Sequence, residues 1–122
     1  MIFIKKRYLL LPLILISLII LIIDLNNNKI TKNEIKNNNI EIYYPSFNNK
    51  KIDNNISKYI NTLILNYYLY ENDNLVLDYN MYYEKDKYII LFNGYFSLDN
   101  KQTNIKDTFY VDLNYNQIVK YK

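Results

Sequence analysis

Carboxylates are the only acid–base groups that this sequence can pair for catalysis. The chain has no histidine and no cysteine, which removes Ser-His-Asp and Cys-His nucleophiles and most zinc sites. Its single glycine leaves no phosphate-binding loop and no dinucleotide fingerprint. Glu71 and Asp73 form the best remaining pair, but a solvated turn between a helix and a strand explains them without function. We therefore predict a protein that is not an enzyme, with no catalytic residue, metal site or cofactor; a carboxylate-based hydrolase is the enzyme alternative.

Tyrosine and amide side chains point to binding. In residues 75–83 the pattern alternates, and Asp78, Asn80 and Tyr82 share one side of the expected strand. Tyr95 lies on the next strand. Polar groups beside tyrosine rings suit a sugar, and tyrosine also anchors protein partners, so these four are the candidate binding residues. The alternative is that these residues are simply the solvent side of an amphipathic strand. Tyrosine and asparagine would then be frequent because the chain is biased towards A/T-rich codons.

One helix and about five strands are expected to position these residues. Residues 40–44 predict a first strand, and Asp53 is the expected N-cap of a helix that ends near Tyr70. The helix repeats apolar residues at steps of three and four: Ile56, Tyr59, Ile60, Leu63, Ile64 and Tyr67. Further strands are expected at 75–83, 88–98, 109–113 and 118–121, with turns at 84–87, 99–104 and 114–117, and with Gly94 at a bulge or close approach. The predicted class is α+β, with the helix packed on an antiparallel sheet.

The N-terminal segment predicts a membrane anchor. Residues 8–23 carry no charge, and Lys5, Lys6 and Arg7 precede them. Together with the apolar residues 1–4, this segment approaches the ~30 Å hydrocarbon core as a helix. The positive-inside rule places the N-terminus in the cytoplasm and the following residues outside. Because no Ala-x-Ala-like cleavage site and no lipoprotein cysteine follow, we expect a retained signal-anchor.

The expected organisation is a transmembrane anchor at 1–25, an Asn- and Lys-rich linker at 26–39 and an extracytoplasmic α+β domain at 40–122. Within the linker, Ile35 is a possible start of a frayed strand. The three N-terminal cations account for the net charge of +3, so nothing predicts a nucleic-acid partner. We expect a single-pass protein of the cell membrane, with residues 8–23 in the lipid bilayer and the C-terminal domain outside.

The order of the elements resembles an extracytoplasmic domain of Gram-positive bacteria. The matching pieces are Ile42-Tyr43-Tyr44-Pro45, Ile52-Asp53-Asn54-x-Ile56, the strands with Tyr79 and 88–96, and Phe109-Tyr110-Val111-Asp112-Leu113 followed by Ile118. That domain occurs N-terminal to peptidoglycan deacetylases and in the membrane-anchored anti-sigma factor that senses lysozyme. Asn116 stands near the family's usual glycine, and the family continues into further helical and strand segments. The resemblance therefore implies the first half of the family's unit and carries over no catalytic residue.

Two functions are consistent with these observations. The first is a non-catalytic binding or sensing module that faces the cell wall and binds a cell-wall glycan or an extracellular protein. The alternative is a small membrane regulatory or immunity protein that acts through its transmembrane helix. Replacing residues 8–23 with an unrelated transmembrane segment separates the two, because only the second function depends on that sequence.

Overall fold

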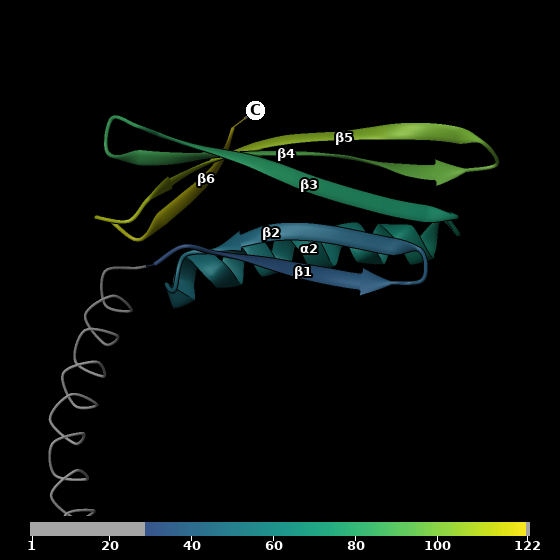
Figure 1. The fold of residues 1–122 in the computed structure, drawn as a ribbon, viewed down its shortest axis with the longest axis horizontal. Coiled ribbons are helices and arrows are strands. Elements are labelled where there is room, and N and C mark those ends of the chain that lie inside the picture. Colours follow the sequence, from purple (N-terminus) through teal and green to yellow (C-terminus); the bar gives the residue numbers. More distant parts are fainter. Residues whose placement is uncertain (1–28, 122) are drawn as a thin grey trace, which may run out of the picture.

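One helix packs against one face of a six-stranded sheet. The structure is a computed structural model that describes residues 29–121, so the predicted anchor at 1–25 lies outside the described residues. Figure 1 shows the helix α2 (Lys50–Leu69) and the strands β1 (Thr31–Asn37), β2 (Ile40–Ser46), β3 (Asn74–Glu84), β4 (Lys87–Leu98), β5 (Lys101–Asp112) and β6 (Gln117–Tyr121). The predicted α+β class is confirmed. Within residues 29–121, no helix combines the length and the hydropathy that a bilayer crossing requires.

The sheet is mixed, which corrects the prediction of an antiparallel meander. The strands lie in sequence order, and every neighbouring pair is antiparallel except β2 and β3. The helix of 20 residues between them is about 30 Å long. It carries the chain back along the whole sheet, so that β3 begins at the same end as β2 and runs parallel to it.

Strand β1 corrects a second expectation, because residues 31–37 lie within the predicted linker at 26–39, where a frayed strand is considered only from Ile35. β1 pairs with β2 along its whole length, from Thr31 opposite Ser46 to Asn37 opposite Ile40. Ile35 lies opposite Ile42 and packs against the core. On the other side of the hairpin, the ammonium of Lys32 lies 4.5 Å from the centre of the Tyr43 ring, a cation–π contact. One apolar side chain and this contact stabilise a strand whose composition is that of a linker.

The core lies between α2 and the sheet. The helix buries one side, which confirms the spacing seen in the sequence, and its buried residues are Ile52, Ile56, Ile60, Leu63 and Tyr67. The sheet contributes alternate residues of its strands, among them Leu75, Leu77, Ile90, Phe92, Ile105, Phe109 and Val111. Phe47, from the connection between β2 and α2, is buried and meets the Tyr88 ring edge-on at 5.5 Å.

The start of α2 differs from the prediction by one turn. Asn49, not Asp53, is the N-cap, and its side chain accepts a hydrogen bond from the Ile52 N–H. Asp53 lies inside the first turn and reaches back instead. Its carboxylate accepts hydrogen bonds from the Phe47 N–H (2.8 Å), the Asn49 N–H (3.3 Å) and the Ser46 hydroxyl (3.0 Å). A carboxylate near the positive end of the helix dipole therefore fixes the connection from β2.

The hairpin between β3 and β4 turns at the predicted residues 84–87, whereas the one between β4 and β5 turns more tightly than expected. Residues 85 and 86 both have positive φ, as do Asp99 and Asn100, which is the signature of two-residue type I′ turns. Aspartate and asparagine tolerate this conformation better than most residues. Because the second turn needs only two residues, β5 begins at Lys101, where the sequence predicted a turn through residue 104.

Gly94 lies at a close approach between β3 and β4. The pairing register runs unbroken past it, with Gly94 opposite Leu77, so the alternative of a bulge is wrong. A Cβ atom on Gly94 would lie 2.0 Å from the carbonyl oxygen of Val76. The absence of a side chain at this position therefore allows β3 and β4 to lie at their observed separation.

Gly94→Ala is expected to lower the free energy of unfolding by about 1–3 kcal/mol, the usual cost of an overpacked site. Thermal and denaturant unfolding of the two proteins measure this difference. The control is Asn104→Ala, at an exposed position of β5, for which we expect a change within about 0.5 kcal/mol. A Gly94→Ala protein as stable as the wild type would show that β3 can move away without cost.

Candidate binding surface

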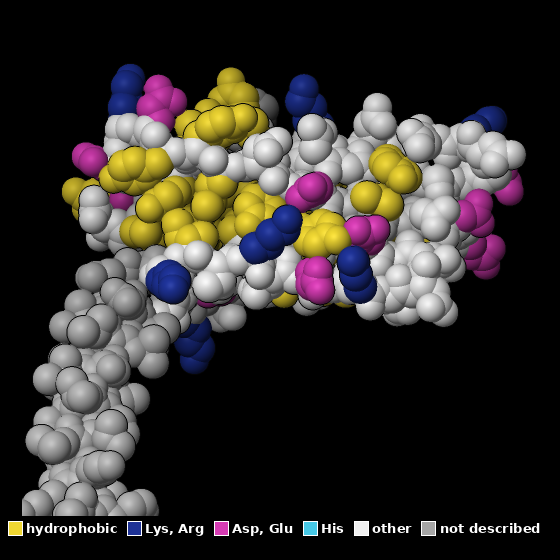
Figure 2. Space-filling view, in the orientation of Figure 1, with side chains coloured by type: hydrophobic (Ala, Val, Ile, Leu, Met, Phe, Trp, Pro, Cys, Tyr) yellow, Lys and Arg dark blue, Asp and Glu magenta, His cyan; other side chains and the backbone are white. Residues whose placement is uncertain are grey.

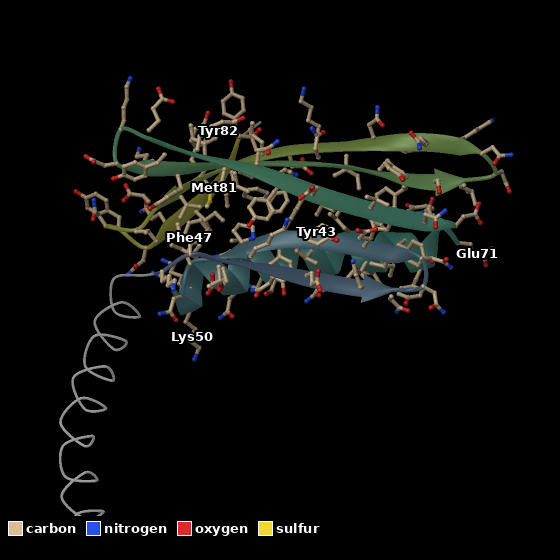
Figure 3. All side chains as sticks on the ribbon, viewed as in Figure 1. Tyr43, Phe47, Lys50, Glu71, Met81 and Tyr82 are labelled. Atoms are coloured by element: carbon tan, nitrogen blue, oxygen red, sulfur yellow. The ribbon has the colours of Figure 1, made fainter. Side chains whose placement is uncertain are left out.

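The four predicted binding residues lie on one face of the sheet, the face turned away from α2. We call it the open face. In the pairing of β3 with β4, Asp78 lies opposite Asn93, Asn80 opposite Leu91, and Tyr95 opposite Val76. Their neighbours along the strands, such as Leu77 and Phe92, are buried on the helix side, so alternation directs the four side chains outward. Figure 3 shows Tyr82 pointing away from α2 and Met81 pointing the other way.

These four residues form a strip rather than a pocket. Tyr82 lies opposite Ile89 and Tyr95 opposite Val76, so the two tyrosines are separated by six residues of β4. At about 3.3 Å per residue this is about 20 Å. Asp78 and Asn80 lie between them and are exposed, whereas Tyr95 is half-buried. We call Asp78, Asn80, Tyr82 and Tyr95 the open-face strip; it has a polar middle with a tyrosine at each end.

Asp78 also has a structural contact within its own strand. Its Oδ1 accepts a hydrogen bond from the Tyr79 N–H at 2.8 Å. The pairing between β2 and β3 ends with Ile42 opposite Leu77, so the next outward N–H on that edge of β3 is that of Tyr79. Burial first, and then the negative charge of Asp78, raise the pKa of Tyr79 above its ordinary value. Asp78 therefore both stabilises the point where β2 leaves β3 and presents a carboxylate on the open face.

The sequence did not reveal an apolar patch beside the strip. Opposite residues on β3 to β6 form a row across the open face, with Tyr82 beside Ile89, Ile89 beside Tyr110, and Tyr110 beside Val119. Tyr121 joins it, and its ring meets that of Tyr110 at 5.7 Å. The exposed fractions are 55% for Tyr82, 59% for Val119 and 63% for Tyr121. Alternation alone predicts which side chains point outward, but only the register shows that they are neighbours.

Hydrophobic side chains are also visible where β2 and β3 separate. Figure 2 shows them between the two strands, at the end of the domain where α2 begins. Tyr79 and Met81 of β3 are half-buried in this region and pack against the core. Figure 3 places Phe47 on the same side of β3 as Met81. We interpret this region as the margin of the core, because its side chains point towards α2 rather than to the open face.

Glu71 and Asp73, the candidate acid–base pair, lie in the loop between α2 and β3, where Asp73 has a structural role. Asp73 accepts a hydrogen bond from the Asp99 N–H at 3.0 Å, which joins the α2–β3 loop to the β4–β5 turn. Glu71 is exposed and has a positive φ directly after the end of the helix. Asp112 accepts hydrogen bonds from the Asn114 and Tyr115 N–H groups, as expected for a turn residue. In the part of the chain that the structure describes, no group of three or more acidic, histidine or cysteine residues could hold a metal ion.

Tyr59 is the titratable group most strongly affected by its surroundings, and it lies on the helix side. Its hydroxyl donates a hydrogen bond to the Asp107 carboxylate, and its ring meets Phe109 at 4.9 Å. The ammonium of Lys120 lies 3.2 Å from the same carboxylate. Burial, and then the hydrogen bond to Asp107, raise the pKa of Tyr59 far above its ordinary value. Tyr59 therefore keeps its proton at a pH where an ordinary tyrosine, with a pKa of about 10, loses it, and it joins α2 to β5.

Comparisons with protein-family models, with curated proteins and with solved structures found no match to this chain. The resemblance to the extracytoplasmic domain therefore remains a prediction from sequence patterns.

Tyr59→Phe is expected to make stability less sensitive to alkaline pH. The folded-state pKa of Tyr59 is raised, so its contribution to stability is fully present below the ordinary tyrosine pKa of about 10. Above that pH the unfolded chain releases the proton first, and the contribution is lost as the pH rises towards the raised value. Unfolding measured between neutral pH and pH values above about 10 should show a shallower decline for Tyr59→Phe than for the wild type. Equal declines would contradict the assignment.

Proposed function

We propose that this protein is a membrane-tethered, non-catalytic binding module that holds a cell-wall glycan on the open-face strip. The observation that carries the proposal is the register of β3 and β4, which gathers a carboxylate, amides and tyrosines on one exposed surface. Tyrosine rings offer an apolar face for the C–H side of a sugar. The carboxylate of Asp78 and the amide of Asn80 offer hydrogen-bond partners for hydroxyl groups.

The shape of the strip favours a chain of sugars over a single ring. The strip is about 20 Å long and lies on paired strands without a gap in their register. A surface already held in place by a ladder of backbone hydrogen bonds does not have to be ordered when the ligand binds, which favours affinity. The apolar patch around Tyr110 and Val119 extends the surface at the Tyr82 end.

The arrangement of carboxylates supports binding rather than hydrolysis. Most glycosidases need two carboxyl groups, about 5 to 9.5 Å apart, with separate acid and base or nucleophile roles. The open-face strip contains one, Asp78. Glu41 faces the same way on β2, but its carboxylate accepts a hydrogen bond from the Tyr43 hydroxyl at 2.7 Å. Asp78 is likewise engaged by a backbone N–H.

The tether proposal rests on the sequence of residues 8–23, and β1 refines it. With an anchor at 1–25 and β1 beginning at Thr31, the connection shortens to residues 26–30. Five residues span at most about 18 Å when fully extended. In this proposal the domain meets its ligand close to the outer surface of the membrane, rather than deep in the wall.

Substituting Asn80→Ala together with Tyr82→Ala is expected to weaken glycan binding by at least about tenfold, because truncating a hot-spot contact costs about 2 kcal/mol or more and about 1.4 kcal/mol is a factor of ten. The measurement is calorimetric titration of the full-length chain in nanodiscs with soluble peptidoglycan glycan fragments. Both side chains are exposed, so the thermal midpoint should stay unchanged.

The matched control is Tyr115→Ala, which removes a tyrosine that is 74% exposed in the turn between β5 and β6. It should bind the fragments like the wild type. Equal binding by the double variant would eliminate the open-face strip as the site. No binding by the wild type, together with capture of an extracellular protein that the double variant loses, would replace the glycan with a protein ligand.

An anchor that serves only as a tether is expected to be exchangeable. Replacing residues 8–23 with an unrelated transmembrane segment should leave glycan binding unchanged, and external protease added to intact cells should cleave the domain. Loss of function in the exchanged protein, with the open face intact, would favour the regulatory or immunity alternative. A domain that is protected in intact cells would refute the proposed orientation.

A further inference from the structure

Half of β5 forms an open edge of the sheet. β6 pairs with β5 only from Thr108 to Asp112, whereas β5 begins at Lys101. Among the described residues, no strand lies beside 101–107 on the side away from β4. Figure 1 shows this half of β5 next to the β4–β5 turn, with β6 at the other end. Unpaired strand edges are places where another strand can add.

The tight turn determines which backbone groups point outward. In a two-residue hairpin the flanking residues, here Leu98 and Lys101, exchange hydrogen bonds with each other. Bonding alternates along an antiparallel pair. The N–H and C=O groups of Gln102, Asn104 and Lys106 therefore point away from β4. The same rule, applied to the β3–β4 turn, directs Leu75 towards β2, and its N–H does bond to the Asn39 carbonyl at 2.9 Å.

A groove lies beside this edge on the helix side. It has a volume of about 420 Å³ and is lined by the end of α2, the following loop and the β4–β5 hairpin. Its lining residues are Asn66, Tyr70, Asn72, Phe96, Leu98, Lys101 and Thr103. An added strand would direct every second side chain into this groove. The apolar rings and aliphatic groups there suit an apolar side chain.

The charge of the edge selects the partner. Lys101 lies in the groove and Lys106 on the open-face side, and both are exposed. The one acidic residue in 101–107 is Asp107, whose carboxylate is already engaged by Tyr59 and by Lys120. Within 101–107 itself the exposed charge is therefore positive, while Glu71, Asp73 and Asp99 lie in the loop and turn next to its Lys101 end. Lysines at an edge repel an identical strand and attract an acidic one.

We propose that residues 101–107 of β5 and the adjoining groove form a second binding site, which takes an extended protein segment of alternating acidic and apolar residues as an added strand. Backbone hydrogen bonds to Gln102, Asn104 and Lys106 set the register of the added strand against β5. The groove takes the apolar side chains, and Lys101 and Lys106 bind the acidic ones. This site lies at the free edge of β5, whereas the open-face strip lies on β3 and β4, and it does not depend on that strip.

The test uses the full-length chain in nanodiscs and two fluorescent peptides, one of alternating glutamate and valine and the other of alternating lysine and valine. Fluorescence anisotropy should show tighter binding of the glutamate peptide. Gln102→Pro removes an outward N–H without touching a bond to β4, and proline is tolerated on edge strands. It should weaken binding at least about tenfold, whereas Gln102→Ala, which keeps the N–H, should bind like the wild type.

If Gln102→Pro lowers the thermal midpoint, a charge-reversal variant tests the same site. Lys101→Glu combined with Lys106→Glu should reverse the preference in favour of the lysine peptide. No binding of the glutamate peptide by the wild type, or equal binding by Gln102→Pro, would overturn the proposal. A dimer that Gln102→Pro dissociates would also overturn it, because a second copy would then occupy the edge. Glycan binding should be unchanged in both Gln102 variants, so the two proposals can fail separately.

Discussion

The burial of one side of α2 against the sheet determines which surfaces remain for a ligand. Ile52, Ile56 and Ile60 are at most 2% exposed, and each fully buried side chain of this size contributes about 1.5–3 kcal/mol. Because the helix covers one face, residues on the other side of every strand are free to face solvent. The tyrosines and amides of β3 and β4 are on that side because the alternation that buries Leu77 and Phe92 leaves no other place for them.

The short parallel pairing of β2 with β3 divides the sheet into two parts that differ in how continuously their strands are hydrogen-bonded. Tight hairpins join β3 to β4 and β4 to β5, each pair over eleven residues, whereas the paired segment of β2 and β3 runs only from Ile40 to Ile42. Beyond it, side chains such as Phe47 fill the space between the strands. Both proposed binding surfaces lie on β3 to β5, the part whose backbone is most continuously paired.

Local pattern predicted the helix, the faces of the strands and the outward direction of Asp78, Asn80 and Tyr82, because periodicity depends only on burial of one side. For β1 it indicated only a frayed strand from Ile35, since the composition of 31–37 is that of a linker and the pairing with β2 defines the full strand. It missed the parallel pair and the two-residue turn at Asp99 and Asn100, which depend on the path of α2 and on positive φ. The apolar patch and the open half of β5 require the register of four strands, which no single segment contains.

We expect the open face, and not the helix side, to hold the ligand. The most direct measurement is the map of NMR chemical-shift changes in the nitrogen-labelled full-length chain in nanodiscs as cell-wall glycan fragments are added. The largest changes should occur at residues 78–82 and at Tyr95, with the exposed side of α2 unaffected. Changes centred on α2, or none on β3 and β4 at saturating glycan, would contradict it.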